Sequence, residues 1–227
     1  MKRVTFYYVR HGKTQFNRDQ IIQGGGVDSP LIPETFATIQ ASAAALSHIA
    51  FAACYASPQG RAQQTAHALL DGMEQAALGV DTMTELQEVN FGALDGKPYA
   101  GHRITFASCF VRQNFSSQGG ECGADVRARG HAAFDKMFAA AHDGDNVLVV
   151  AHGALLRYLL LEFWTSRGIA ARKIKSFTLH TPNAGIATIE GVAGTRADAG
   201  REDRGAATFT LTALPQTAAD FVRARRA

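Results

Sequence analysis

The chain has 227 residues, of which 46% are apolar and 19% are charged. This is ordinary for a soluble protein that buries a sizeable core, so we expect a single domain over residues 1–227. The net charge of +3 is dispersed and no apolar run approaches the roughly 20 residues of a membrane span, so neither nucleic acid nor membrane is expected as a partner.

Short apolar segments bounded by polar or glycine-containing turns are typical of strands buried on both faces. In chain order, these segments are 4–9, 52–56, 80–83 and 147–151. The spacing of apolar residues between them predicts helices at 35–48, 61–70, 124–141 and 154–164. Alternation of strands and helices indicates right-handed crossovers and a mainly parallel sheet that is covered on both sides.

The C-terminal part has a different pattern. Closely spaced strand candidates at 174–179, 184–189 and 207–214 predict an antiparallel edge of the sheet. The glycine-rich, charged stretch at about 191–205 predicts a mobile surface loop, and residues 218–227 predict a frayed tail. The expected fold is therefore α/β, a three-layer α/β/α sandwich with a mostly parallel sheet and an antiparallel edge.

Two of the predicted strands end on a histidine followed by a glycine. The first strand runs into Arg10-His11-Gly12, and the strand at 147–151 runs into His152-Gly153. Ligands of open parallel sheets bind beyond the carboxyl ends of the strands, so we expect both imidazoles and the guanidinium to share one small volume. A glycine after each histidine leaves space for a bulky anion to approach the backbone.

A third strand end adds a cation, because Arg61 follows Ser57-Pro58 near the start of a predicted helix. The helix dipole disfavours a cation there unless an anion is bound, and paired guanidinium groups suit phosphate oxygens. A carboxyl group beside a bound dianion retains its proton to higher pH, which suits a general acid. Spacing alone does not choose between Glu85 and Glu88 in the loop after residues 80–83.

Taken together, these residues resemble the histidine phosphatase superfamily, also called the phosphoglycerate-mutase-like family. The resemblance extends over residues 4–189 and rests on five ordered motifs: RHG at 10–12, QGGGVDSPL at 23–31, SPQGRAQQTA at 57–66, LQEVNFGALDG at 86–96 and VVAHGALLR at 149–157. The fourth motif singles out Glu88 over Glu85.

The resemblance implies phosphoryl transfer through a phosphohistidine on His11, which would attack as a neutral imidazole with its other ring nitrogen held by an acceptor. Arg10, Arg61 and His152 would bind the phosphoryl oxygens. Glu88 would protonate the leaving alkoxide and then deprotonate the attacking water. No metal or other cofactor is implied. The implied substrate contacts are Asn17, Gln23, Gly24 and Gly153.

A phosphatase hands the phosphoryl group to water, whereas a mutase hands it to another hydroxyl group. Phosphoglycerate mutases resemble E-R-x-Y-G after the acid, and this chain has EVNFG at 88–92. The segment 97–117 is short and aromatic-rich, which we interpret as a lid and core rather than a carboxylate-binding pocket. We therefore expect a phosphatase that acts on small phosphomonoesters and releases phosphate.

Three alternatives remain. The first is a 2,3-bisphosphoglycerate-dependent phosphoglycerate mutase. The second is a non-catalytic phospholigand-binding protein, which should have lost one of the five catalytic groups. The third is a metal site built from His11, His152 and Glu88, although their spacing resembles no known ligand set. The three scattered cysteines make no disulfide framework and predict reduced thiols and a cytoplasmic location. The natural substrate, the oligomeric state and the role of Cys122 are not predicted.

Overall fold

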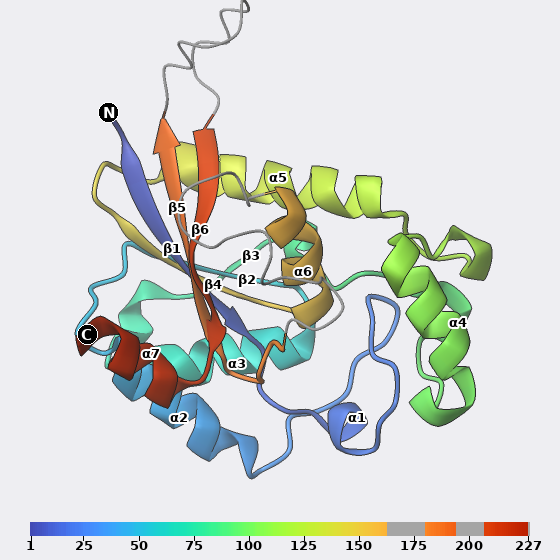
Figure 1. Ribbon diagram of the computed structural model, residues 1–227. Helices are drawn as coiled ribbons and strands as arrows, with labels where there is room; N and C mark the ends of the chain where they lie inside the picture. Colours follow the sequence, from blue (N-terminus) through green and yellow to red (C-terminus); the bar gives the residue numbers. More distant parts are fainter. Residues whose placement is uncertain (163–179, 194–206, 227) are drawn as a thin grey trace, which may run out of the picture.

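A six-stranded sheet forms the middle of the fold, with its strands in the order β3-β2-β4-β1-β5-β6 (Figure 1). The computed structural model describes residues 1–162, 180–193 and 207–226. The parallel strands are β1 (Arg3–Arg10), β2 (Ala53–Ala56), β3 (Asp81–Thr82) and β4 (Asn146–Ala151). Two antiparallel strands, β5 (Ile186–Ala193) and β6 (Ala207–Gln216), form one edge. The predicted mixed sheet is confirmed.

Helices cover both faces of this sheet. On one side lie α2 (Thr35–Leu46), α3 (Gly60–Gly72) and α7 (Ala218–Arg226) (Figure 1). On the other side lie α5 (Gly123–Ala140) and α6 (Gly153–Glu162), and α4 (Tyr99–Arg112) joins the same core cluster. The short α1 (Gln15–Arg18) follows β1. Single 3₁₀ turns occupy Ala76–Leu78, Thr84–Leu86, Gly92–Leu94 and Ser116–Gln118.

The central strand β1 shows why the sequence has a continuous apolar run here. Phe6 and Tyr8 belong to the core cluster shared with α5 and α6. Tyr7 and Val9 belong to the cluster shared with α2, α3 and α7. Because successive side chains of a strand point to opposite faces, a strand that is covered on both faces needs apolar residues at every position. These two clusters fix the strand whose end carries Arg10.

The C-terminal tail is a correction to the prediction, because residues 218–226 form α7 rather than a frayed end. Thr217 accepts a hydrogen bond from the backbone N–H of Asp220 (3.3 Å), and this acidic residue lies in the first turn, where the helix dipole favours it. Phe221 is 2% exposed and its ring centroid lies 6.4 Å from that of Tyr7. Burial of this one aromatic ring anchors the helix on the sheet.

Two other predictions for the C-terminal part have different outcomes. The predicted loop at 191–205 begins too early, since residues 191–193 pair with β6 as part of β5, and its remainder lies outside the described residues. The predicted strand at 174–179 also lies outside them. Within the described ranges, none of the helices is both long enough and apolar enough to span a membrane.

Candidate active site

The two histidines come together because their strands are neighbours. Arg10 at the end of β1 is in register with Ala151 at the end of β4, and the backbone N–H of His11 donates to the carbonyl oxygen of Ala151 (2.9 Å). The residue that follows β4 is His152, whose ring centroid lies 5.2 Å from that of His11. The predicted convergence at the carboxyl ends of the strands is observed.

The ring of His11 has one nitrogen fixed and one available. Its Nδ1 lies 2.7 Å from the carbonyl oxygen of Gly12, which only accepts hydrogen bonds, so Nδ1 carries the proton and Nε2 keeps its lone pair. Burial, followed by the positive charges of Arg61 and Arg10, holds the pKa of His11 well below its usual range. At neutral pH the imidazole is therefore uncharged and has a free electron pair at Nε2.

The ring of His152 is held through Nε2, whereas that of His11 is held through Nδ1. Its Nε2 lies 2.7 Å from Oγ of Ser57, and its Nδ1 is buried without a hydrogen-bond partner. Its backbone is fixed by Tyr8, which donates to its carbonyl oxygen (2.8 Å) and accepts from its N–H (3.0 Å). Burial and the charges of Arg61, His11 and Arg10 also lower the pKa of His152 well below its usual range.

Arg61 lies in the first turn of α3 and is 1% exposed. Its Nη1 donates to Oδ1 of Asp28 (2.7 Å) and to the carbonyl oxygen of Val27 (3.1 Å), and its Nη2 donates to the carbonyl oxygen of Gly24 (3.3 Å). Asp28 thus supplies the negative charge that a cation at a helix N-terminus requires. The Nε of Arg61 has no partner.

Arg10 is fixed on one side only. Its Nη1 donates to the carbonyl oxygen of Thr181, whereas its Nε is buried and has no partner. A Cβ atom on Gly153 would lie 3.2 Å from that Nε, so the glycine makes room for the guanidinium. Burial lowers the pKa of Arg10 to about 10, which leaves it protonated at neutral pH.

The unsatisfied groups of this cluster point to an anion. Buried polar atoms nearly always have hydrogen-bond partners. Yet Nε of Arg10, Nε of Arg61 and Nδ1 of His152 have none, and the pKa of His152 responds to the charges of both arginines. Two guanidinium groups and a second imidazole, each with an unpartnered buried nitrogen near the neutral ring of His11, form a site that an oxyanion would complete.

The carboxyl group of Glu88 lies at the N-terminus of α6, the helix that follows His152. Its Oε1 accepts from the backbone N–H groups of Leu155 (2.8 Å) and Val89 (3.0 Å), and its Oε2 accepts from that of Ala154 (3.0 Å). The carboxyl group thus occupies the N-terminus of a helix, which favours negative charge. Glu85 instead pairs with Lys136 away from the site. The structure therefore brings Glu88, and not Glu85, to the histidines.

The loop that carries Glu88 is held by a residue that sequence reasoning missed. Arg129 on α5 donates from Nη1 to the carbonyl oxygens of Glu85 (2.9 Å) and Gln87 (2.7 Å), and from Nη2 to that of Glu88 (3.3 Å). The same guanidinium forms a bidentate pair with Glu121 at 2.8 and 2.9 Å. More than 40 residues separate Arg129 from this loop, so no local pattern identifies the contact.

Two of the predicted substrate contacts, Asn17 and Gln23, differ in the hydrogen bonds that hold their side chains. Oδ1 of Asn17 accepts from Asn183 (3.2 Å), which leaves its amide N–H groups for a ligand, whereas Gln23 is bonded at both ends, to Thr14 (2.7 Å) and to Oγ of Ser29 (3.1 Å). Asn17 and Gln23 both line the cavity described below. Oδ1 of Asn17 also accepts from the backbone N–H of Thr14 (3.3 Å), so both side chains are held by two hydrogen bonds.

Other residues fill the space beside Gly24 and Gly12. Gly24 donates its N–H to Asp95 (2.9 Å), is not among the residues that line the cavity, and would place a Cβ 2.4 Å from Asp95, so it shapes the loop around Arg61. The space beside Gly12 is taken by Thr35, whose Oγ1 would lie 2.8 Å from a Cβ there. Of the two glycines after histidine, only Gly153 lines the cavity.

A cavity of about 480 Å³ lies beside this cluster. Its polar lining comes from Arg10, Asn17, Gln20, Gln23, Glu88, Arg157 and Thr181. Aromatic side chains form its wall, namely Phe16, Phe91, Tyr99, Phe106 and Phe110. His11, Arg61 and His152 are 3%, 1% and 0% exposed and do not line it, so they lie beneath the surface that Arg10 and Gly153 present. The aromatic residues of 97–117 thus contribute both to the core and to the cavity wall.

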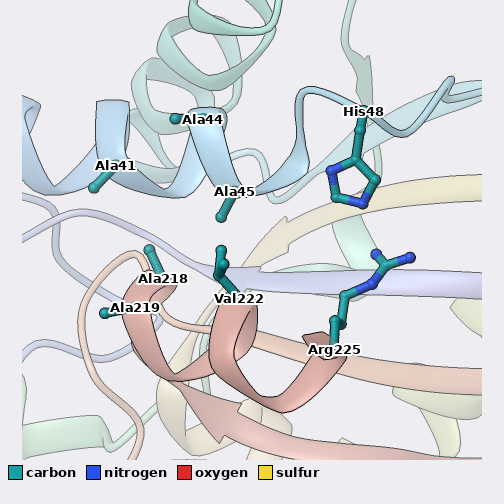
Figure 2. Close-up of a pocket in the computed structure, with 8 residues that line it drawn as sticks. All are labelled: Ala41, Ala44, Ala45, His48, Ala218, Ala219, Val222 and Arg225. Carbon is teal, nitrogen blue, oxygen red and sulfur yellow. The ribbon is translucent and has the colours of Figure 1, made fainter. Parts of the chain in front are cut away.

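A larger hollow of about 720 Å³ between α2 and α7 has a different character (Figure 2). It is lined by Ala41, Ala44, Ala45, His48, Ala218, Ala219, Val222 and Arg225. Its alanine surface holds one imidazole and one guanidinium and no carboxyl group, so it lacks the acid and nucleophile of the cluster around His11.

The model of the histidine phosphatase superfamily (branch 1) matches residues 6–197. The chain belongs to the histidine phosphatase superfamily. This confirms the resemblance drawn from the five motifs, and the sheet order and the paired strand ends described above show where those motifs lie in the superfamily fold. Residues outside the described ranges make up part of the matched region.

Two curated relatives illustrate the range of the superfamily. Over 168 residues the chain is 32% identical to fructose-2,6-bisphosphatase TIGAR of Mus musculus, covering 71% of this chain and 62% of the mouse protein. It therefore spans less than two thirds of that relative. It is also 31% identical over 160 residues to 2,3-bisphosphoglycerate-dependent phosphoglycerate mutase 2 of Gloeobacter violaceus, covering 68% of this chain and 73% of the mutase.

Solved structures agree on the fold. A phosphoglycerate mutase from Bacillus anthracis superposes with a TM-score of 0.75 at 26% identity, covering 100% of this chain and 98% of the mutase. The mycobacterial glucosyl-3-phosphoglycerate phosphatase superposes with a TM-score of 0.71 at 23% identity, covering 95% of this chain and 100% of the phosphatase. The second likeness shows the fold alone.

Proposed function

We propose that this protein is a phosphatase that hydrolyses small phosphomonoesters through a phosphohistidine on His11. The observation that carries the proposal is the set of unpartnered donors on Arg10, Arg61 and His152 around a neutral imidazole whose Nε2 lone pair is free. Such donors bind the charge that spreads over the phosphoryl oxygens in the transition state, and each typically contributes about 10²- to 10³-fold in rate.

In the first step, Nε2 of His11 attacks phosphorus and the bond between phosphorus and the leaving oxygen breaks. Glu88, which lines the cavity beside Arg10, delivers a proton to that oxygen, so the alcohol leaves neutral. In the second step, Glu88 takes a proton from water, the water oxygen bonds to phosphorus, and the nitrogen–phosphorus bond breaks. Inorganic phosphate leaves and His11 returns to its neutral form.

We further infer that the preferred substrates carry a second anionic group. Arg157 lines the same cavity, next to Glu88, with its guanidinium carbon 5.5 Å from the ring centroid of Phe110. Burial lowers the pKa of Arg157 while Glu88 raises it, which supports a position near the acid. The relatives named fructose-2,6-bisphosphatase, 2-carboxy-D-arabinitol-1-phosphatase and putative phosphoserine phosphatase 2 all have names that specify substrates with a second phosphate or a carboxylate.

The runner-up function is a 2,3-bisphosphoglycerate-dependent phosphoglycerate mutase, which the relative from Gloeobacter violaceus supports. A mutase would isomerise 3-phosphoglycerate without release of phosphate and would depend on the bisphosphate. Measuring released phosphate and isomerised product side by side, over a panel of phosphorylated metabolites, separates the two functions. We expect released phosphate.

The deciding experiment on the mechanism uses p-nitrophenyl phosphate. We expect hydrolysis that persists in EDTA, a phosphoenzyme that intact mass spectrometry detects after acid-free quenching, and loss of both with His11→Asn. Activity that survives this substitution would show that His11 is not the nucleophile. Loss of activity in EDTA would favour the metal-site alternative, and binding of phosphate without turnover would favour the non-catalytic protein.

Arg157→Gln tests the substrate class separately. We expect the KM for phosphomonoesters with a carboxylate or second phosphate to rise about tenfold or more, the usual loss for a charge-assisted hydrogen bond. The KM for neutral esters of similar size should not change.

We also place this activity in a reducing cytoplasm, a proposal that the free thiols of Cys54, Cys109 and Cys122 support.

A further inference from the structure

We propose that Ser57 is a positioning residue that fixes the tautomer of His152, so that this imidazole offers an N–H group at Nδ1 to the phosphoryl oxygens. The inference rests on the proposed phosphatase function, in which His152 is a phosphate ligand. The inference gives Ser57 a role in the site, whereas the motif at 57–66 indicates only that this residue precedes a helix.

Ser57 is rigidly held where β2 passes into α3. It is fully buried, its N–H donates to the carbonyl oxygen of Val150 on β4 (3.0 Å), and its carbonyl oxygen accepts from Nε2 of Gln63 (2.7 Å). These contacts tie its backbone to the strand that ends at His152. The hydroxyl oxygen lies 2.7 Å from Nε2 of that histidine, and the backbones of both residues are held by hydrogen bonds.

The hydrogen bonds of the hydroxyl group determine its direction. The backbone N–H of Gln59 donates to Oγ of Ser57 (3.4 Å), so this oxygen already acts as an acceptor. Its own proton needs an acceptor, and within the described residues the hydrogen-bond partner of this oxygen other than Gln59 is the ring nitrogen Nε2 of His152. If Ser57 donates to Nε2, then in the neutral ring Nε2 holds the lone pair and Nδ1 holds the proton.

The opposite tautomer would be costly. A proton on Nε2 would leave the Ser57 hydroxyl without an acceptor and would place the lone pair of His152 at Nδ1, which is buried and has no partner. A buried hydroxyl proton without an acceptor destabilises the folded state. With a phosphoryl dianion bound, a lone pair at Nδ1 would also repel its oxygens, whereas an N–H there attracts them.

The tautomer matters because the ring of His152 is neutral in the free enzyme and does not attract an anion through a net positive charge. Burial, the positive Arg61 and Arg10 and the electrostatic effect of His11 lower its pKa well below the usual range, so its neutral form predominates at neutral pH. A neutral imidazole attracts an oxyanion only through the nitrogen that carries the proton. Ser57 thus decides whether this ring helps or hinders binding of the phosphoryl group.

The test combines Ser57→Ala with nitrogen-15 NMR of the histidine rings, which distinguishes the two neutral tautomers. We expect the wild-type ring of His152, assigned by comparison with His152→Asn, to be protonated at Nδ1 and Ser57→Ala to show a mixture. With p-nitrophenyl phosphate, kcat/KM should fall about tenfold to a hundredfold, within the range for an oriented donor, and Ser57→Thr should restore most of it.

The matched control is Ser42→Ala, because Ser42 is also buried and its hydroxyl donates over 2.7 Å to the carbonyl oxygen of Ala184. It should lower stability without a change in the His152 spectrum. His152→Asn places an amide near the position of Nδ1 and His152→Gln near that of Nε2, so the asparagine variant should keep more activity. That comparison applies even if the threonine variant does not fold.

A wild-type spectrum with the proton on Nε2 would overturn the proposal. An unchanged tautomer in Ser57→Ala, together with kcat/KM within about twofold of wild type, would overturn it as well. Failure of the phosphatase function itself is a separate result. It would appear as absence of turnover and of phosphoenzyme in the wild type, while the tautomer would remain measurable with vanadate as the oxyanion.

Discussion

His11 and His152 face each other with their ring centroids 5.2 Å apart and their planes inclined by 57°. Nδ1 of His11 is bonded to a carbonyl oxygen, whereas Nε2 of His152 is bonded to a serine hydroxyl. The two rings therefore carry their protons on the same atom and expose opposite ends. One has a lone pair to attack phosphorus and the other has a donor to hold its oxygens.

The lowered pKa values of both histidines predict how stability depends on pH. Below the unfolded value of about 6.5, the unfolded chain binds protons that folded His11 and His152 resist, because burial and the nearby arginines disfavour their charged forms. Stability should therefore fall as pH decreases from 7 toward 5, by at most about 1.4 kcal/mol per pH unit for each histidine.

Urea unfolding at a series of pH values measures this effect. The double variant His11→Asn with His152→Asn lacks both groups and should lose less stability between pH 7 and 5. Parallel slopes for the variant and the wild type would show that other groups control the acid sensitivity. The same lowered pKa keeps His11 nucleophilic in mild acid, so kcat/KM should hold its plateau below pH 6.5.

Glu88 should matter most when the leaving group needs a proton. Replacing it by glutamine removes the acid, so hydrolysis of alkyl phosphates should slow by about 10²- to 10⁴-fold, and that of p-nitrophenyl phosphate by less. Glu85→Gln is a matched control from the same loop, since Glu85 pairs with Lys136 outside the site. Equal slowing of both substrate types by Glu88→Gln would contradict the general-acid role.

Arg129 should act on the same step through the position of Glu88. Arg129→Lys keeps the charge but cannot donate to Glu85, Gln87, Glu88 and Glu121 at once, as the guanidinium does. We expect about a tenfold to hundredfold loss of kcat for alkyl phosphates, in line with the loss of about 1.5–3 kcal/mol for hydrogen bonds to a charged group.

Inhibition by vanadate separates this effect from general damage to the site. The phosphoryl ligands do not contact Arg129, so the inhibition constant should stay within about twofold of wild type. Weaker vanadate binding in Arg129→Lys would show that the whole site has loosened. Lys136→Met removes an exposed ion pair from the same helix and should leave both measurements unchanged.

The sequence predicts the parts of this molecule that follow a local rule. Strand β1 is apolar and buried from Phe6 to Val9 because both its faces are covered there, and its end at Arg10 places His11 at the ligand edge of a parallel sheet. Contacts between distant segments follow no such rule. The turn at 181–184 supports the site, since Thr181 accepts from Arg10 and Asn183 donates to the carbonyl oxygen of His11 (3.1 Å).

Glycine roles were the least predictable feature of the site. Both His-Gly pairs look alike in the sequence, but a Cβ on Gly12 would meet Oγ1 of Thr35 at 2.8 Å, whereas one on Gly153 would meet Oγ1 of Thr181 at 2.9 Å and then Nε of Arg10 at 3.2 Å. Which atoms lie beside a glycine depends on the tertiary packing of segments that are far apart in the chain. The same dependence explains why the C-terminal tail was not predicted as a helix, because its residue Phe221 is buried against Tyr7, which lies far away in the sequence.

That burial predicts a large effect of one substitution in α7. Phe221 is 2% exposed, so Phe221→Ala should lower the free energy of unfolding by about 3 kcal/mol or more through lost packing and a residual cavity. Phe36→Ala is the matched control, since Phe36 is 42% exposed and its truncation should cost little.

Activity tests whether α7 contributes only stability. Phe221 packs in the cluster with Tyr7 and α2 and does not line the cavity beside Glu88. At temperatures well below its melting transition, Phe221→Ala should therefore keep the wild-type kcat and KM for p-nitrophenyl phosphate. A change in kcat at constant fold, measured by circular dichroism and steady-state kinetics on the same sample, would mean that the position of β1, and with it His11, depends on this helix.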